Sequence, residues 1–299
     1  IFGDHTRLIK YIDAPFFIGA DGVKIIRSRL KEINYKYLYY ALLNVSIPNT
    51  GYNRHFKWLK ETKIYYPDSE KQKYIVEVLD KISLIIEKKN KQIEQWDILL
   101  KSLFIEMFGD PVENPMNWDV KELGDYITVL TDFNSNGSYE LLDSNVVMKD
   151  EPDYAWIVRI TDLETMNEKG RKYIDEKTWN LLEKSKICGN EIIMCKIGSA
   201  GKIYIMPNTG KPASLGRNAF MFRFNELLER EYVYYLLNTD YGIKEITQYV
   251  RGAVTKTITK DDVRRLRVIV PPINEQRKFI SSINKIDKSK YSSFLHLSA

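Results

Sequence analysis

A heptad pattern of apolar residues runs through the chain from Ser69 to Phe108. The apolar positions recur at alternating steps of four and three residues, and only Lys89 interrupts the series. An average spacing of about 3.5 residues, held over about four to five heptads, is typical of a helix packed along a partner helix. At 1.5 Å rise per residue such a helix is roughly 57 Å long. The pattern predicts a coiled-coil spacer helix whose interface comprises Ile75, Leu79, Ile82, Ile86, Ile93, Trp96, Leu100 and Leu103.

A buried helix in the core of one large domain is the alternative interpretation of this segment. Core helices rarely keep a strict heptad over such a length, which favours the spacer. Gly109 and Pro111 follow Phe108 closely, and this order is typical of a helix C-terminus.

A second pattern, made of short apolar and β-branched stretches, fills residues 118–272. It predicts strands at residues 155–160, 191–196, 202–206 and 219–224. It also predicts helices at residues 175–184, 230–237 and 259–266. This mixture indicates an α+β domain with a curved antiparallel or mixed sheet.

Parts of this domain are repeated near the N-terminus. Residues 35–40 match residues 231–235, and both have a helical pattern. Residues 63–75 match residues 267–280, and each copy reads as a strand, a proline and the start of a helix. The copies lie about 200 residues apart, which is the period of a domain rather than of a solenoid repeat.

The same alignment places residues 1–3 opposite residues 196–198, in the middle of the second unit. We therefore expect the first unit to lack its front half. Either the chain is a fragment, or another chain or a circular permutation supplies the missing part.

Length and composition restrict the class of protein. The chain has 299 residues, 44% hydrophobic and 28% charged, which is enough for two domains of ordinary size. No apolar run approaches the ~20 residues of a membrane span, and no signal-peptide pattern occurs, so we expect a cytoplasmic protein without a membrane partner. Cys188 and Cys195, with three scattered His, predict free thiols and no metal site. The net charge of +5 permits a polyanionic partner without requiring one.

Short motifs occur in a fixed order around the repeat. Residues 118–125 read Trp-x-Val-x-x-Leu-Gly-Asp, and residues 189–193 and 197–202 are a strand followed by a glycine turn. Residues 251–258 contain a glycine loop, and residues 270–276 place Pro-Pro ahead of Glu-Gln. In this order, and over nearly the whole chain, the motifs resemble the target-recognition domains and spacer junctions of type I restriction-modification specificity subunits.

The resemblance implies an α+β fold with two target-recognition domains, the first truncated at its N-terminus, separated by long antiparallel coiled-coil helices. Residues 1–69 would be the C-terminal part of the first domain, and residues 70–108 the first spacer helix. Residues 109–273 would be the second domain, and residues 274–299 the start of the second spacer helix. Residues 67–72, Pro-x-x-Glu-x-Gln, match the spacer junction more loosely.

The resemblance also implies a role and partners. Each domain would read half of a bipartite double-stranded DNA target, and the spacer helices would dock the modification (methyltransferase) and restriction (translocase and nuclease) subunits. The chain itself would be non-catalytic and hold no cofactor, because S-adenosylmethionine, ATP and Mg²⁺ would bind the partner subunits. The second spacer helix is short and residues 289–299 continue the heptad poorly, so self-association through the first spacer helix is also expected.

Sequence-specific DNA reading needs cations for phosphates and hydrogen-bonding side chains for base edges, on loops that enter a groove. Three segments of the second domain carry such side chains, and residues 4–7 and 53–57 are their counterparts in the first. An arginine–carboxylate bridge explains Arg217 or Arg251 equally well, and a turn explains Asn218. The candidates are Lys196, Ser199, Lys202, Lys211, Ser214, Arg217, Asn218, Arg251, Thr255, Lys256, Thr257 and Lys260, with Arg54 and Lys57 in the first domain.

The sequence shows no catalytic pattern. No G-x-x-x-x-G-K-[ST] motif occurs, and residues 114–117 follow the predicted helix rather than a strand, so they match an adenine-methylating tetrapeptide poorly. The carboxylates near Lys196 form no recognisable metal-nuclease set. Two other function classes remain: the DNA-recognition part of a fused restriction enzyme, and a coiled-coil protein adaptor without DNA specificity.

Overall fold

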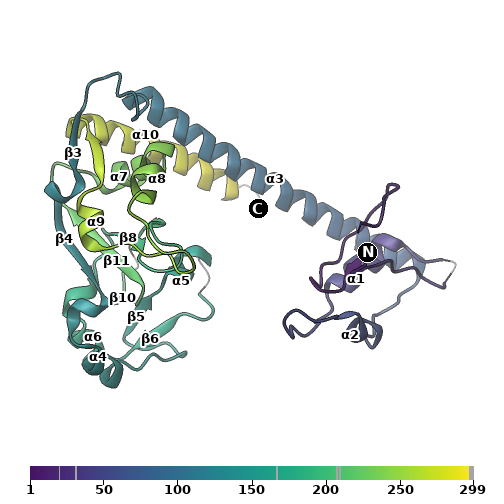
Figure 1. Ribbon diagram of the computed structural model, residues 1–299. Coiled ribbons are helices and arrows are strands. Elements are labelled where there is room, and N and C mark those ends of the chain that lie inside the picture. The colour runs from purple at the N-terminus through teal and green to yellow at the C-terminus, as the bar shows by residue number, and fades with distance from the viewer. Residues whose placement is uncertain (20, 31, 166–167, 207, 209, 296–299) are drawn as a thin grey trace. The chain divides into compact units, whose positions relative to one another are not determined.

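The computed structural model describes residues 1–295 apart from residues 20, 31, 166, 167, 207 and 209. Two compact units divide between Trp96 and Asp97, inside the long helix α3 (Ser69–Phe108). The predicted spacer helix is confirmed as one continuous helix of 40 residues (Figure 1). Residues 296–299, the end of the predicted second spacer segment, lie outside the described residues.

The first unit has a small core formed by the elements that precede α3 in the chain. Its elements are β1 (Phe2–Gly3), β2 (Val23–Lys24), α1 (Tyr35–Leu43) and α2 (Phe56–Lys60). Strands β1 and β2 pair antiparallel. Helix α1 begins where the Asn34 side chain accepts hydrogen bonds from two backbone N–H groups of the first turn, which would otherwise have no partner. The core residues are Phe2, Leu38, Leu42 and Leu59.

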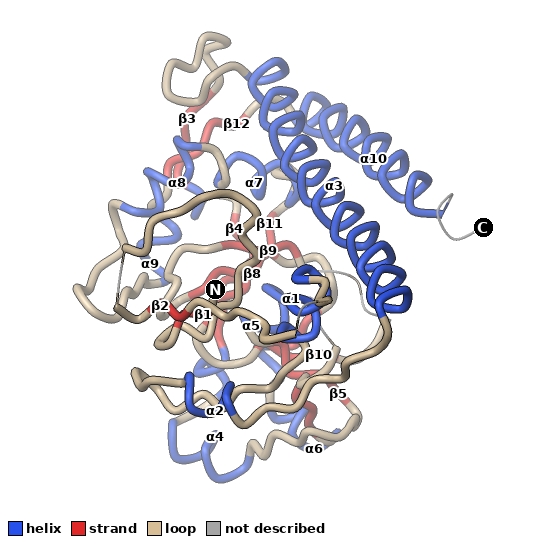
Figure 2. The backbone as a smooth tube through the Cα atoms, turned by 90° about the vertical axis from the view of Figure 1, so that its right-hand side faces the viewer, coloured by secondary structure: helices blue, strands red, loops and turns tan. Residues whose placement is uncertain are grey.

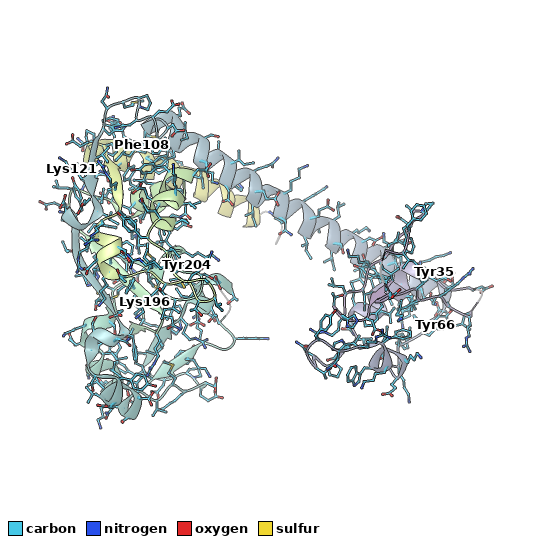
Figure 3. The ribbon with its side chains drawn as sticks, in the orientation of Figure 1. Tyr35, Tyr66, Phe108, Lys121, Lys196 and Tyr204 are labelled. Atoms are coloured by element: carbon cyan, nitrogen blue, oxygen red, sulfur yellow. The ribbon has the colours of Figure 1, made fainter. Side chains whose placement is uncertain are left out.

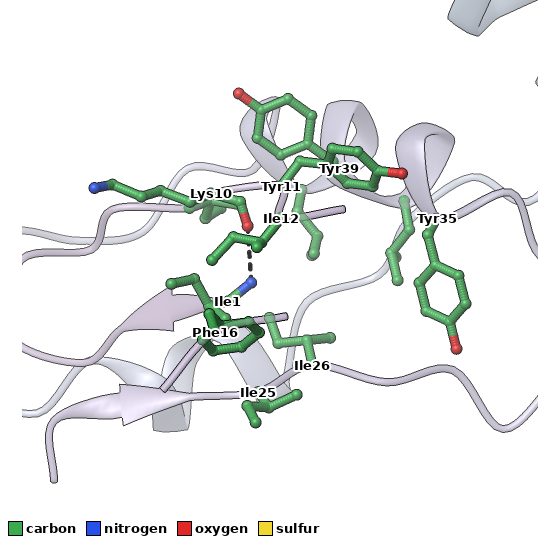
Figure 4. Close-up of a pocket in the computed structure, with 12 residues that line it drawn as sticks. Ile1, Lys10, Tyr11, Ile12, Phe16, Ile25, Ile26, Tyr35 and Tyr39 are labelled. Carbon is green, nitrogen blue, oxygen red and sulfur yellow. Dashed lines mark hydrogen bonds between the residues drawn. The ribbon is translucent and has the colours of Figure 1, made fainter. Parts of the chain in front are cut away.

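An apolar pocket of about 280 Å³ opens beside this core (Figure 4). Phe16 and Ile25 line one part of it and Tyr39 of α1 another. The Ile1 amine lies in the pocket wall and donates a hydrogen bond to the Lys10 carbonyl at 2.8 Å.

The second unit contains two four-stranded sheets and a two-stranded ribbon. One sheet is antiparallel, in the order β4–β11–β8–β9. The other, β6–β5–β10–β7, is mixed because β5 and β10 run parallel. The ribbon pairs β12 with β3. The strands are β3 (Asp119–Glu122), β4 (Ile127–Asp132), β5 (Ala155–Val158), β6 (Lys172–Ile174), β7 (Lys186–Ile187), β8 (Ile192–Cys195), β9 (Ile203–Ile205), β10 (Ala213–Leu215), β11 (Ala219–Phe224) and β12 (Arg267–Val270).

Helices α7 to α10 pack with the antiparallel sheet and the end of α3, whereas α4 to α6 pack with the mixed sheet. Helix α10 runs back alongside the C-terminal part of α3, as Figures 1 and 2 both show. Phe104 and Phe108 of α3 contact Phe279 of α10 in the same core. The helices are α4 (Tyr139–Asn145), α5 (Ile160–Thr165), α6 (Glu176–Leu181), α7 (Arg230–Leu237), α8 (Asp240–Thr247), α9 (Lys260–Arg264) and α10 (Ile273–Leu295), with short 3₁₀ turns at Leu123–Asp125, Phe133–Asn136 and Glu183–Ser185.

Most elements predicted for the second unit are confirmed. The four predicted strands are β5, β8, β9 and β11, and the three predicted helices are α6, α7 and α9. The mixed sheet is present together with an antiparallel one, so the expectation of a single sheet is too simple.

The predicted strand at residues 63–66 of the first unit is wrong. Its counterpart β12 is a strand because β3 supplies hydrogen-bonding partners along its whole length. Among the described residues, no segment pairs with residues 63–66, which have no regular structure. An extended sequence forms a strand only where a second strand satisfies its backbone groups.

The repeat is visible in individual hydrogen bonds, first at the junction into α3. Gln72 donates through Nε2 to the Pro67 carbonyl at 2.8 Å, and its Oε1 accepts the Asn34 N–H at 3.1 Å. The Tyr37 hydroxyl donates to the Tyr65 carbonyl at 2.5 Å. These bonds fix α1 and the chain before the proline to the start of the long helix.

The junction into α10 uses the same bonds. Gln276 donates to the Pro271 carbonyl at 2.8 Å and accepts the Glu229 N–H at 2.9 Å. The Tyr232 hydroxyl donates to the Ile269 carbonyl at 2.9 Å. The two junctions are therefore copies of one structure, and the predicted repeat is confirmed.

The turns after β1 and β8 also correspond, but the residues that match differ from those in the predicted alignment. They share three backbone hydrogen bonds, so Asp4 lies at the position of Lys196. The alignment of residues 1–3 with residues 196–198 is wrong by three residues, because residues 1–4 correspond to residues 193–196. The turn of the first unit is two residues shorter, which accounts for part of this shift. The bonds are Gly3 N to Leu8 O, Arg7 N to Gly3 O and Asp4 N to Gly22 O in the first unit, and Cys195 N to Lys202 O, Gly201 N to Cys195 O and Lys196 N to Asn218 O in the second.

The predicted helix interface is buried only in part. Leu100 and Leu103 pack against the core of the second unit. The other interface residues are half-buried or exposed within the part of the chain that the structure describes. Half-buried are Ile75, Leu79 and Trp96, whereas Ile82, Ile86 and Ile93 are exposed.

Candidate nucleic-acid interface

Two of the three predicted loop segments of the second unit meet and form one surface. The turn at residues 196–202 joins β8 to β9, and the loop at residues 251–257 precedes α9. Gly198 N–H donates to the Lys256 carbonyl at 2.9 Å, and Ile258 N–H donates to the Lys196 carbonyl at 3.2 Å. The two segments lie about 55 residues apart in the sequence, and these hydrogen bonds hold them together at the end of strands β8 and β9.

A buried carboxylate holds two of the predicted lysines. Asp132, at the end of β4, accepts hydrogen bonds from Lys196 Nζ at 2.9 Å and from Lys260 Nζ at 2.8 Å. The Ser135 hydroxyl donates to the same carboxylate at 2.6 Å and accepts from Lys260 at 2.7 Å. The cluster therefore connects β4, β8 and α9 and keeps a net positive charge at the surface.

Sequence reasoning missed Asp132. It is an ordinary polar residue at a strand end, and its two partners lie 64 and 128 residues further along the chain. No local pattern marks such a residue, since only the sheet order β4–β11–β8 places it beside Lys196.

The protonation of Asp132 follows from these contacts. Burial alone raises the pKa of its carboxyl group, but the hydrogen bonds from Lys260, Ser135 and Lys196 outweigh burial and lower the pKa to about 2. The carboxylate therefore stabilises the fold above its unfolded pKa of 3.8, and this contribution is lost as the pH falls from there toward 2.

We expect Asp132→Asn to lower the free energy of unfolding of the second unit by about 2 kcal/mol at pH 7. The amide keeps the shape but leaves two ammonium groups without a counter-charge. Urea denaturation at pH 7 and pH 3 measures the effect, which should be smaller at pH 3. Asp143→Asn, which removes a surface ion pair to Arg217, is the control and should change stability by less than about 1 kcal/mol. An equal loss at both pH values would contradict the ionic explanation.

Glu164 holds the other lysine of the turn. Lys202 Nζ lies 2.8 Å from Glu164, and the Tyr204 hydroxyl donates to the same oxygen at 2.9 Å. Burial and this hydrogen bond raise the pKa of Tyr204 to about 12, so the phenol stays protonated. Lys196 and Tyr204 both belong to the second unit (Figure 3). Ser199 is exposed in the turn between them.

In the loop at residues 251–257, the Arg251 guanidinium lies 2.8 Å from Asp262, a carboxylate that caps α9. Arg251 thus forms an arginine–carboxylate bridge, and its side chain remains 64% exposed. Lys256 and Thr255 are exposed, and Thr257 closes the loop by exchanging two backbone hydrogen bonds with Arg251.

The third predicted segment, residues 211–218, is mostly structural. Ser214 is fully buried in β10 and bonds to Ser185, so we remove it from the proposed surface. Arg217 lies 3.3 Å from Asp143, again a carboxylate bridge. Asn218 has a φ of 67°, which confirms its turn role, and Lys211 is exposed.

The first unit presents a different set of groups at the equivalent place. Asp4 lies where the second unit has Lys196, and its buried carboxylate accepts the Phe56 N–H at 2.7 Å. Lys57 lies over the Trp58 ring at 4.2 Å, and Arg54 is exposed. The two surfaces therefore differ in charge at a matched position.

The described residues include neither a metal-binding cluster nor a membrane-spanning helix. Among the residues that the structure describes, no cluster of three or more His, Cys, Asp or Glu is placed to hold a metal ion. Within the same residues, no helix has the length and apolar character that crossing a membrane requires.

The organisation into two units agrees with comparisons to known proteins. A family model described as type I restriction modification DNA specificity domain matches residues 3–95 and 115–292. The specificity subunit of the type I restriction enzyme MjaVIII of Methanocaldococcus jannaschii is 24% identical, with 91% of this chain and 69% of that protein aligned. The putative MjaX specificity subunit of the same organism is 26% identical, with 77% of this chain and 53% of that protein aligned. The chain thus spans between about half and about two thirds of the length of these relatives.

Solved structures give weaker similarities. The HsdS subunit of Thermoanaerobacter tengcongensis has a TM-score of 0.42 at 15% identity, over 89% of this chain and 66% of that one. A subunit from a type I R-M system assembly has a TM-score of 0.47 at 14% identity, over 86% and 62%. The family model, by contrast, matches in two places that together span most of the sequence. This chain belongs to the family of type I restriction-modification DNA specificity domains.

Proposed function

We propose that the chain is the part of a type I restriction-modification complex that reads a two-part double-stranded DNA target, one half-site per unit. The observation that carries this proposal is the duplicated junction, in which Gln72 and Gln276 make the same buried hydrogen bonds at the start of α3 and α10. A reader built from two copies of one module suits a split target, because each copy presents equivalent loops on its own surface.

The surface of the second unit supplies groups of the required kind. Lys196, Lys260 and Lys256 provide cations for phosphates, and Arg251 has the geometry to bind a guanine edge. Because the buried Asp4 replaces Lys196 in the first unit, we expect that unit to lack a phosphate contact at this position.

We further propose that the chain acts without catalysis of its own. In this view the modification subunit binds S-adenosylmethionine, and the restriction subunit binds ATP and Mg²⁺. Both would dock on the spacer helices, where Ile82, Ile86 and Ile93 form an exposed apolar stripe.

The test is to incubate the purified chain, alone and with a type I modification subunit, with random duplex DNA and to sequence the retained fraction. Enrichment of a split motif supports the proposal. A single half-motif would show that only one unit reads DNA, and no enrichment would favour the protein-adaptor alternative.

The exposed stripe gives a separate prediction about assembly. We expect Ile86→Lys to weaken binding of the modification subunit by at least about tenfold. The lysine would be buried without a partner in the complex, and its charge would have to be desolvated. Ile86 is 55% exposed in the chain, so the change should not affect folding. Gel filtration and titration calorimetry measure the complex, with Gln95→Lys on the same helix as the charge-matched control. Unchanged affinity of the Ile86 variant would place the docking surface elsewhere; Leu79→Lys is less suitable because Leu79 is half-buried.

A further inference from the structure

The tip of the loop at residues 251–257 is apolar and fully exposed. Val254 has 99% of its surface accessible. A single exposed valine is common on protein surfaces and by itself indicates nothing. Its meaning depends on how the loop is built and on which groups flank the tip.

The base of this loop is fixed on two sides. Arg251 and Thr257 exchange hydrogen bonds of 2.9 and 2.8 Å, and Thr257 also forms a bridge to Ile197 in the neighbouring turn. Gly252 has a φ of 104°, and a Cβ there would lie 2.1 Å from the Thr255 carbonyl. The loop therefore holds Val254 outward in a conformation that requires glycine at position 252.

The first unit carries a comparable tip. His55 N–H donates to the Asp4 carbonyl as Ile258 N–H does to that of Lys196, so the preceding loops are equivalent. In that loop Tyr52 is 89% exposed, and its ring stacks on His5 at 4.7 Å. The first unit thus exposes an aromatic ring with a phenolic hydroxyl in this loop, so the two loop tips differ in size and in hydrogen-bonding capacity.

Cations flank Val254 on both sides, at Arg251 and Lys256. Such an arrangement suits a loop that enters the major groove, with cations at the phosphates and the tip at base edges. The thymine methyl group is the apolar feature on those edges. A short β-branched side chain fits a methyl contact better than insertion between bases, for which larger apolar side chains are typical.

We propose that Val254 contacts a thymine methyl group in the half-site read by the second unit, and so determines specificity at that base pair. This inference rests on the proposed function.

The test uses the sequence selected by the wild-type chain and replaces each thymine in turn by deoxyuridine, which lacks the methyl group. At one position we expect the wild type to bind about fourfold more weakly, the effect of burying one methyl group. For Val254→Ala, the same replacement of thymine by deoxyuridine should lower the affinity by less than about twofold. Val112→Ala, which changes an exposed valine just after α3, is the control and should keep the wild-type response.

The outcomes separate the two proposals. If the wild type selects a motif but no thymine shows a methyl response, or if Val254→Ala keeps the full response, the Val254 contact is wrong while DNA reading stands. If Val254→Ala weakens binding equally at every sequence, the tip contacts DNA without reading it, which also overturns the inference. If the wild type enriches no sequence, the proposed function itself fails.

Discussion

A chain carrying Arg251→Ala and Lys256→Ala together should bind its selected DNA sequence no better than random duplex. The two substitutions remove the exposed cations on either side of the loop tip. Loss of a base-reading arginine alone lowers the affinity about tenfold or more. Each lost phosphate contact reduces by about one the slope of the logarithm of the binding constant against the logarithm of salt concentration. Fluorescence anisotropy at several salt concentrations, on selected and random duplexes, measures both effects.

Folding should survive this double substitution. Asp262, the partner of Arg251, keeps its hydrogen bonds from Thr259 N–H at 3.0 Å and from Thr259 Oγ1 at 2.6 Å. An ion pair with a largely exposed arginine contributes little to stability. Arg277→Ala with Lys278→Ala, on α10, removes the same charge and serves as the control. If both double variants bind the selected sequence equally well, the loop does not belong to the contact surface.

The sequence predicted those features of the fold that depend on local periodicity. The heptad from Ile75 to Met107 predicted one unbroken helix, and α3 is that helix. The Pro-to-Gln junction predicted the repeat, because a buried glutamine that bonds at least two backbone groups constrains the sequence around it. Both signals lie within a few turns of one element, where spacing along the chain determines geometry.

Other features depended on contacts between distant segments and were not predictable in this way. Residues 63–66 form no strand because no described segment pairs with them. Ser214 is buried because its hydroxyl packs against Ser185, which lies 29 residues earlier in the chain. The turn after β1 is two residues shorter than its counterpart and contributed to the error of three residues in the alignment. That error hid the fact that Asp4 takes the place of Lys196. In the candidate site, the loops were found from their residue types, but the Asp132 cluster that organises them was not.

The second large effect concerns stability. Phe104→Ala should lower the free energy of unfolding of the second unit by roughly 3–5 kcal/mol. The Phe104 ring lies 5.0 Å from Phe108, 5.7 Å from Tyr232 and 5.5 Å from Phe279, measured between ring centroids. Its removal leaves a cavity at the point where α3, α7 and α10 meet, and ring packing is lost along with apolar burial.

Urea denaturation of the full chain, monitored by far-UV circular dichroism, measures this loss. Ile105→Ala is the matched control because Ile105 is the next residue of the same helix and is exposed, so its truncation should change stability by less than about 0.5 kcal/mol. A similar small change for Phe104→Ala would mean that the aromatic cluster does not anchor the spacer helix. The expected large loss would instead mean that the C-terminal part of α3 folds as one body with the rest of the second unit.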